Sequence, residues 1–211
     1  DLEGAEFPVA PVVPFMQCIH DRITLEVSRG CTRGCRFCQA GILYRPVRER
    51  SPARLLELAS LSLQNSGHEE LSLSSLNVGD YSCLMHLLSG LEDDHTSISL
   101  PSLRPGVLNP ALTEGVRRGR KTGFTLVPEA GTDRLRRVIN KEVSEEALFE
   151  DITQLLHAGW VSFKLYFMIG LPTETQEDIE SIVTLCQRIL RLSRNGKRIQ
   201  RVGVSLSSFV P

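Results

Sequence analysis

The sequence predicts an α/β fold in which six parallel strands alternate with helices and form an incomplete barrel. Apolar runs typical of strands alternate with amphipathic runs bounded by capping residues, a pattern that favours a parallel sheet with right-handed crossovers. The chain has 211 residues, whereas a full eight-fold barrel needs about 250. Six units fit this length, so we expect the barrel to remain open.

The expected strands are runs of apolar and β-branched residues, at 23–27, 71–73, 97–100, 124–127, 161–169 and 202–206. The first run alternates between apolar and polar positions, as a strand with one buried face does. The run at 161–169 is the longest, which indicates a strand buried on both faces. These runs place one strand in each of the six units.

Helices are expected between these strands, at 52–67, 81–91, 109–118, 133–139, 145–157 and 176–192. Ser51 followed by Pro52 is a helix start, because serine caps the first turn and proline fits its first position. Thr175 followed by Asp178 resembles a capping box with Asp in place of Glu. Both signals fix the start of a helix more sharply than periodicity does.

The first 18 residues carry Pro8, Pro11 and Pro14 with little periodicity. We interpret residues 1–18 as an extended lead-in, or a linker from an absent upstream domain, and residues 19–211 as one core domain. The chain starts at Asp1 rather than Met and stops at a strand-to-loop junction. It is therefore expected to be a fragment of a longer protein.

The bulk composition excludes some function classes. The net charge of −1 provides no global field for nucleic acid or membrane, and no apolar run approaches the roughly 20 residues of a membrane span. Six cysteines in a chain of this length are too sparse for a secreted disulfide scaffold, so we expect a cytoplasmic protein. Cys186 is expected to pack in the core, Cys83 likewise, and Cys18 to be a spectator.

The remaining cysteines, Cys31, Cys35 and Cys38, have the spacing C-x3-C-x2-C in a loop after the first strand. Three thiolates on one loop can hold three irons of a [4Fe-4S] cluster and leave the fourth iron open to a small chelating molecule. Two other interpretations stay open: a zinc site with a distant fourth ligand, and buried cysteines without a ligand. A loop at the carboxyl end of a strand is where α/β folds build active sites.

With Phe37 just before the third cysteine, and with the segments 19–22, 27–31 and 45–52, the chain resembles the radical S-adenosylmethionine (radical SAM) superfamily. It is most similar to the cobalamin-binding-type radical SAM proteins, which are related to methylthiotransferases. The resemblance implies a partial (β/α)6 TIM-type barrel. It also implies that a [4Fe-4S] cluster and SAM bind, and that SAM is cleaved to a 5′-deoxyadenosyl radical that abstracts hydrogen from an unknown substrate.

The same resemblance implies further partners. An electron donor such as flavodoxin or ferredoxin would reduce the cluster, and a cobalamin-binding region would lie upstream of this chain. The substrate, a small molecule or an RNA, and the residues that act on it stay unknown. The alternatives are an RNA-modifying, methylthiotransferase-like enzyme and, outside enzymes, an Fe–S electron-transfer protein or a zinc-stabilised interaction module.

The resemblance also implies cofactor contacts at strand ends. Phe37 belongs to the cluster motif. Gly79 stands where the backbone of the relatives holds the amino group of SAM, and Glu129 stands where the relatives have a polar residue on the ribose. Lys141 stands where a base faces the methionine carboxylate, and the Ile169–Gly170 pair where backbone contacts adenine. For Lys141 a solvated helix-end charge is the alternative.

Basic residues surround the cysteine loop between positions 29 and 50. One interpretation is a funnel for an anionic partner such as RNA, and the other is structural ion pairing with some tuning of the cluster. After the third strand, Arg104 replaces an acidic residue of the relatives and is expected either to grip a carboxylate or to lie at the surface. Tyr166 replaces an Asp of the relatives.

Overall fold

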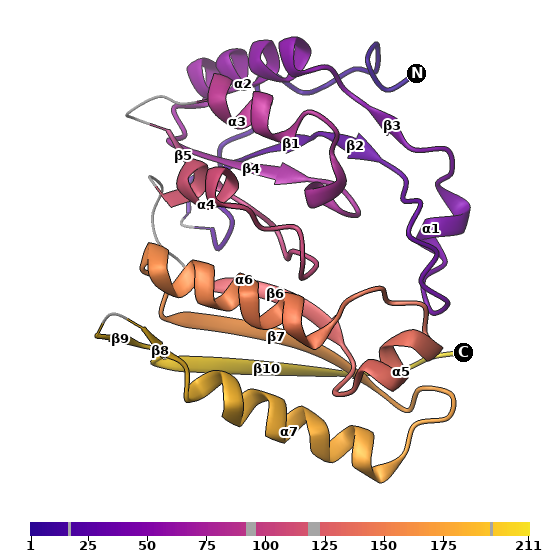
Figure 1. Ribbon diagram of the computed structural model, residues 1–211. Helices are drawn as coiled ribbons and strands as arrows, with labels where there is room; N and C mark the ends of the chain where they lie inside the picture. Colours follow the sequence, from indigo (N-terminus) through magenta and orange to yellow (C-terminus); the bar gives the residue numbers. More distant parts are fainter. Residues whose placement is uncertain (17, 92–95, 118–122, 195) are drawn as a thin grey trace.

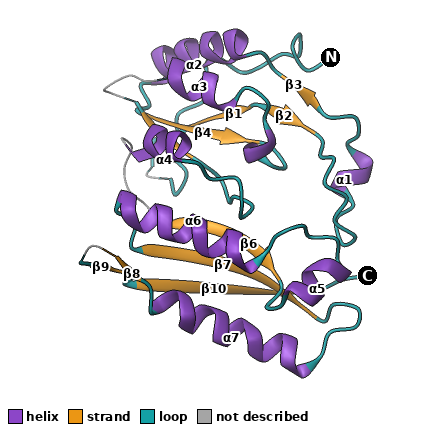
Figure 2. Ribbon diagram, viewed as in Figure 1, coloured by secondary structure: helices purple, strands orange, loops and turns teal. Residues whose placement is uncertain are grey.

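The computed structural model describes residues 1–16, 18–91, 96–117, 123–194 and 196–211. All six expected strands are present and pair in parallel in two three-stranded sheets, β1-β4-β5 and β10-β7-β6 (Figures 1 and 2). The strands are β1 (Ile23–Glu26), β4 (Glu70–Ser74), β5 (Ser97–Ser99), β6 (Phe124–Glu129), β7 (Ser162–Ile169) and β10 (Arg201–Ser208).

A short parallel bridge joins the two sheets just after β5. The Leu103 amide donates to the Thr125 carbonyl at 3.0 Å, and the Val127 amide donates to the Leu103 carbonyl at 3.1 Å. The six strands thus follow one another in an open arc, and the described strands do not close into a ring. The expected partial barrel is confirmed.

The helices agree with the capping signals. α2 (Pro52–Ser66) follows Ser51, whose side chain accepts from the Arg54 amide, and ends at Gly67 in the left-handed conformation. α7 (Gln176–Leu190) begins with the predicted capping box of Thr175 and Asp178. The other helices are α1 (Ala40–Leu43), α3 (Leu84–Gly90), α4 (Pro110–Arg117), α5 (Asp133–Val138) and α6 (Glu145–Ala158). Residue 118, the expected end of α4, lies outside the described residues.

Some elements differ from the expectation. The helix expected at 81–91 begins at Leu84, because a 3-10 turn, η1 (Val78–Asp80), comes first and the Tyr81 hydroxyl donates to the Arg50 carbonyl. Two antiparallel pairs were not expected, β2 (Ser28–Arg29) with β3 (Arg48–Glu49) and β8 (Ser193–Arg194) with β9 (Lys197–Arg198). Two-residue strands are too short to produce periodicity. The first pair closes the base of the cysteine loop.

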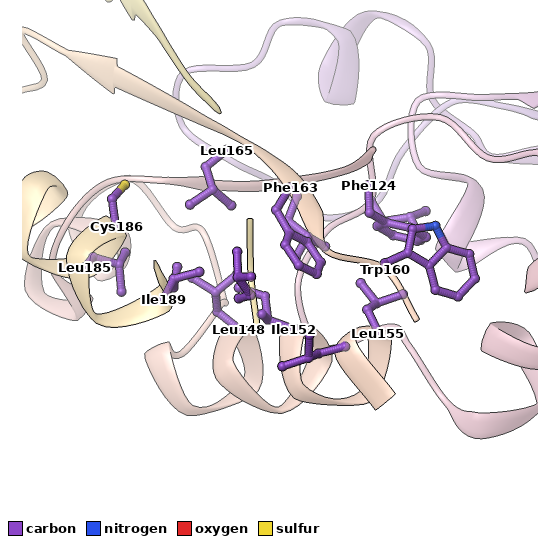
Figure 3. Packing of buried hydrophobic residues seen from close by; sticks show 14 of the residues in the cluster. Phe124, Leu148, Ile152, Leu155, Trp160, Phe163, Leu165, Leu185, Cys186 and Ile189 are labelled. Atoms are coloured by element: carbon purple, nitrogen blue, oxygen red, sulfur yellow. The ribbon is translucent and has the colours of Figure 1, made fainter. Parts of the chain in front are cut away.

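The apolar core has two main parts, one for each sheet. In the second, Phe163 and Leu165 of β7 pack against α6 and α7, and Phe124 meets Trp160 edge to face at 5.8 Å (Figure 3). In the first, Leu25 and Leu73 pack against the inner face of α2. The partly buried Leu100 and Leu108 contact both parts. Cys186 lies in the second core, as expected, and Cys18 is exposed.

The N-terminal segment packs on α2. Leu2 is buried, and the Glu3 carboxylate accepts from the Ser51 amide at 2.7 Å and from its hydroxyl at 2.5 Å. The Asn65 side chain donates to the Val9 carbonyl at 3.0 Å. The described residues before β1 form neither helix nor strand. In the part of the chain that the structure describes, no helix has the length and apolarity to cross a membrane.

Candidate functional site

The cysteine loop runs from β2 to β3, includes α1, and depends on a glycine at its base. Gly30 has a φ of +99°, and a Cβ there would stand 2.5 Å from the Tyr44 carbonyl oxygen and 2.9 Å from that of Pro46. Any other residue would collide with the returning chain. Gly30 therefore lets the two ends of the loop approach closely, and it positions Cys31, which follows directly in the chain.

The tip of the loop is held by the segment that follows α5, more than a hundred residues later. The Asn140 side chain donates to the Gly34 carbonyl at 2.9 Å, and the Arg36 amide donates to the Ile139 carbonyl, also at 2.9 Å. Phe37 packs on a small apolar cluster that includes Leu135 and Ile139. In Figure 1 the loop descends from the N-terminal half toward α5. The loop is thus fixed by both halves of the molecule.

The three cysteines of the loop are free thiols, partly exposed, and line one cavity of about 230 Å³. The Arg33 amide donates to the Cys31 sulfur at 3.4 Å. Burial raises the pKa of Cys35, and the nearby positive charges of Lys141 and Arg104 oppose this. Cationic groups beside thiols favour the thiolate form that binds metal.

No three His, Cys, Asp or Glu side chains of the described residues converge as they would around a single metal ion. In an iron–sulfur cluster each thiolate binds its own iron, so the ligands stand around a larger group than one ion. The relevant geometric observation is therefore the shared cavity, which all three sulfur-bearing side chains line.

Glu129 and Lys141 line the same cavity and form an ion pair, with 3.2 Å between Nζ and Oε1. Their side chains are 13% and 10% exposed. Burial raises the pKa of Glu129, and the adjacent Lys141 opposes the rise. Glu129 ends β6 with a φ of +70°, which turns the chain away from the sheet at this point. A nearly buried carboxylate and ammonium thus face the thiols from the second half of the molecule.

Of the expected cofactor residues, the structure brings Phe37, Glu129 and Lys141 to the thiol cavity. Gly79 lies in η1, where a Cβ would stand 3.0 Å from the Val107 side chain. The Ile169–Gly170 pair ends β7, and the Gly170 amide donates to the Glu174 carboxylate at 2.6 Å. These three residues are not among the described residues that line the cavity, and their cofactor contacts stay predictions.

Some residues of the site had no strong signal in the sequence. Arg33 donates through Nε to Asp80 at 2.6 Å, and the Asn77 side chain donates to the same carboxylate at 2.6 Å. This network ties the cysteine loop to η1, and both Arg33 and Asn77 line the thiol cavity. Arg104 is only 8% exposed and lines the cavity too, so the expectation of a surface position is wrong.

Most of the arginines around the loop have partners within the protein. Arg29 donates to Glu26 through two nitrogens at 2.8 and 2.7 Å. Arg50 is 2% exposed and donates to the Ala5 carbonyl at 3.2 Å, and Arg48 donates to the Pro46 carbonyl at 3.2 Å. These contacts fit the structural interpretation of the basic residues better than an open surface for RNA.

Residues 25–186 match the family model of the radical SAM superfamily. Over 187 residues the chain is 36% identical to an uncharacterized protein of Methanocaldococcus jannaschii, over 89% of this chain and 40% of that protein. It is 24% identical to the threonylcarbamoyladenosine tRNA methylthiotransferase MtaB of Treponema pallidum, with 81% and 37% covered. It is 25% identical to the ribosomal protein uS12 methylthiotransferase RimO of a Thermoanaerobacter species, with 85% and 42% covered.

The chain therefore spans about two fifths of the length of these relatives. Among solved structures it is similar to the radical SAM methyltransferase TsrM of Kitasatospora setae, described with cobalamin and a [4Fe-4S] cluster bound. The TM-score is 0.66 at 13% identity, over 87% of this chain and 36% of that one. At this identity the likeness shows the fold.

Proposed function

The chain belongs to the radical SAM superfamily, and on this premise we propose that it is the core of a radical SAM enzyme. Cys31, Cys35 and Cys38 would hold a [4Fe-4S] cluster through their thiolates. The observation that carries the proposal is that all three free thiols line one cavity together with Glu129 and Lys141. A cavity with three soft ligands and one ion pair suits a metal cluster and a charged organic cofactor side by side.

The residues of the cavity fit both cofactors. Thiolates are the ligands that iron–sulfur clusters use, and Lys141 and Arg104 offset their negative charge. When bound, the cluster and SAM supply a one-electron cleavage of a C–S bond, which gives methionine and a 5′-deoxyadenosyl radical that abstracts hydrogen from the substrate. The protein supplies orientation and excludes water from the cavity.

We assign the organic cofactor to the other side of the cavity. The Glu129 carboxylate is an acceptor suited to the paired hydroxyls of a ribose. Lys141 is a cation suited to the carboxylate of the methionine part, and Phe37 covers the cluster side. Gly79 and the Ile169–Gly170 pair would contribute backbone contacts from neighbouring strand ends. The reductant would be a flavodoxin or ferredoxin, in the cytoplasm.

A methylthiotransferase-like activity is the second candidate, and the names of the curated relatives favour it. Those relatives act on a tRNA and on a ribosomal protein at nearly the same identity to this chain, 24% and 25%. Sequence identity therefore does not choose between the two substrates. Cobalamin, which is bound in TsrM, would be bound here by a region upstream of this chain.

The test is anaerobic reconstitution of the protein with iron and sulfide, followed by reduction with dithionite in the presence of SAM. We expect 5′-deoxyadenosine from the wild type and from Cys18→Ala, which changes an exposed cysteine outside the loop. Cys35→Ala should lose the 5′-deoxyadenosine, because a cluster ligand is missing. The readouts are chromatography of the product and the electron paramagnetic resonance spectrum of the reduced cluster.

The two non-enzyme alternatives give different results in this experiment. A cluster whose spectrum is unchanged by SAM would favour the electron-transfer protein. Uptake of zinc with no cluster would favour the interaction module and contradict the proposal. Formation of 5′-deoxyadenosine by Cys35→Ala at the wild-type rate would contradict the assignment of the ligands.

A further inference from the structure

A second cavity, of about 600 Å³, adjoins the thiol cavity, and we name it the outer cavity. Its walls are the loop between β5 and α4 on one side and the connection from α5 to α6 on the other (Figure 1). Arg33, Arg104 and Lys141 line both cavities. A molecule in the outer cavity would therefore lie directly beside the proposed cofactor site.

The two guanidinium groups in this shared wall have donors to spare. The contacts of Arg104 with the described residues use Nη2, which donates to the Glu142 carbonyl, so Nε and Nη1 have no protein acceptor there. Arg33 donates through Nε and Nη2 to the Asp80 carboxylate, and its Nη1 points toward the Glu142 carboxylate. A guanidinium with free donors is suited to a carboxylate or a phosphate.

Glu142 stands in the place that such an anion would take. Its Oε2 lies 3.7 Å from Arg104 Nη2 and 3.9 Å from Arg33 Nη1, which is beyond direct hydrogen-bond length for both. The Glu142 side chain is 68% exposed. Its carboxylate is thus a loosely held counter-ion that can swing into water at little cost.

The other acidic group of the outer cavity that approaches a base is already engaged. The Asp133 carboxylate accepts from the Arg136 side chain at 2.6 Å and from the Glu145 amide at 3.2 Å. Arg137 adds a further positive charge to the lining. Glu146 lines the outer cavity too, so its lining has four cationic and three acidic side chains. An incoming anion would consequently meet the unused donors of two guanidinium groups, and the carboxylate it would displace is that of Glu142, 3.7 and 3.9 Å from them.

We propose that the outer cavity binds an oxyanion group of the enzyme's substrate, between Arg33 and Arg104, by displacing the carboxylate of Glu142. The oxyanion is a phosphate or a carboxylate, since the fork of a guanidinium fits both. The role as substrate site depends on the proposed function, whereas the binding of an anion does not. The two parts are therefore tested separately.

The experiment is isothermal titration of the protein, free of iron and SAM, at low salt. Pyrophosphate is the phosphate probe and succinate the carboxylate probe, and the tighter of the two identifies the class of group. Glu142→Gln should bind the tighter probe about 3- to 10-fold more strongly, because the competing charge is gone. Arg104→Gln should weaken binding by about 10-fold or more, because a charged hydrogen bond is lost.

Arg201→Gln is the matched control, because Arg201 is exposed on β10 and lines neither cavity. It should bind like the wild type. Equal affinity in Glu142→Gln and wild type, or equal losses in Arg104→Gln and Arg201→Gln, would overturn the inference. Since Glu142 is mostly exposed, its variant stays informative even if Arg104→Gln fails to fold. Normal anion binding with no cleavage of SAM would instead count against the proposed function alone.

Discussion

The two halves of the molecule differ in how they are built. The strands of the N-terminal sheet have 4, 5 and 3 residues, whereas those of the C-terminal sheet have 6, 8 and 8. The short-stranded half carries the cysteine loop, and the long-stranded half contains the core around Phe163 and Trp160. The thiols therefore extend from the half with the shorter strands, while the half with the larger core holds their loop in place.

This division is incomplete, because the loop crosses it. Gly30 and Cys31 follow the first strand, but the tip is bonded to Ile139 and Asn140 of the C-terminal half. Glu129 and Lys141 reach the thiols from that half as well. A substitution in the core of one half is therefore expected to change the exposure of the loop as well.

The largest effect is expected from the C-terminal core. Phe163→Ala should lower the free energy of unfolding by about 3–5 kcal/mol, because a fully buried ring leaves a cavity. Leu25→Ala, in the N-terminal core, should cost about 2–5 kcal/mol. The single Trp160 reports on the C-terminal half by fluorescence, and thiol labelling reports on the loop.

Because the loop is bonded to both halves, we expect the fluorescence and labelling transitions of Phe163→Ala to coincide in urea. Labelling of the loop cysteines at a urea concentration that leaves the fluorescence unchanged would show that the halves unfold separately. Cys18, Cys83 and Cys186 are replaced by Ala in the background of this experiment, so that labelling reads the loop alone.

A smaller effect is expected from the base of the loop. Gly30→Ala should cost about 2–4 kcal/mol, since it adds a left-handed strain of about 1–2 kcal/mol and a collision with the carbonyls of Tyr44 and Pro46. Iron uptake should fall with it. Gly4→Ala is the control, because nothing lies within 4 Å of its added Cβ. Wild-type iron content in Gly30→Ala would show that the loop tolerates a shifted base.

The smallest effects are expected from pH, through two buried carboxylates of the C-terminal half. Burial opposes ionisation of Asp178, but hydrogen bonds from Thr132, Thr175 and Arg134 outweigh it and hold its pKa well below the usual range. A pKa depressed by folding stabilises the protein above pH ~4, and this stabilisation is lost as the pH falls further. Asp178→Asn should lower the free energy of unfolding by about 1–3 kcal/mol at neutral pH and by less in acid.

Asp151 should show the opposite slope. Burial raises its pKa to about 6, although the Gly106 amide, which donates to it at 2.7 Å, works against the rise. The folded protein then holds a proton that the unfolded chain releases between pH ~4 and ~6, so stability falls as the pH rises through this range. The free energy of unfolding of Asp151→Asn should therefore rise relative to that of the wild type as the pH increases over that interval.

Urea midpoints of the wild type and both variants, measured in steps from pH ~3 to ~8, test the two opposite pH dependences of stability. Parallel curves for the wild type and Asp151→Asn would mean that this carboxyl does not titrate with folding. A loss in Asp178→Asn that is constant across the range would mean the same for Asp178.

The sequence alone predicted most of the frame. Ser51 with Pro52 and the Thr175–Asp178 box gave the starts of α2 and α7, because capping is a contact between residues that are close in the chain. The run at 161–169 became β7 as expected, but burial on both faces was wrong. Phe163, Leu165 and Phe167 are buried on one face, whereas Lys164 on the other face is exposed. The start of α3 was wrong because η1 and the Tyr81 contact precede it.

The site was predicted only in part. The spacing of the three cysteines pointed to one loop, and Phe37, Glu129 and Lys141 do reach its cavity. Of the two interpretations of Arg104, the surface position was wrong, and the grip on a carboxylate stays a prediction. The bond from Asn140 to Gly34 was missed, because no local pattern marks a partner more than a hundred residues away.

The alternation of strands and helices, the caps of α2 and α7, and the three thiols on one loop follow from local sequence. These features depend on periodicity and on neighbours a few residues apart. Only the tertiary structure decided that Lys141 and Arg104 face those thiols, that Glu142 stands between two guanidinium groups, and that Asn140 holds the loop. Such contacts form when the ends of distant strands meet at one edge of the sheet, and this meeting is a property of the folded arc.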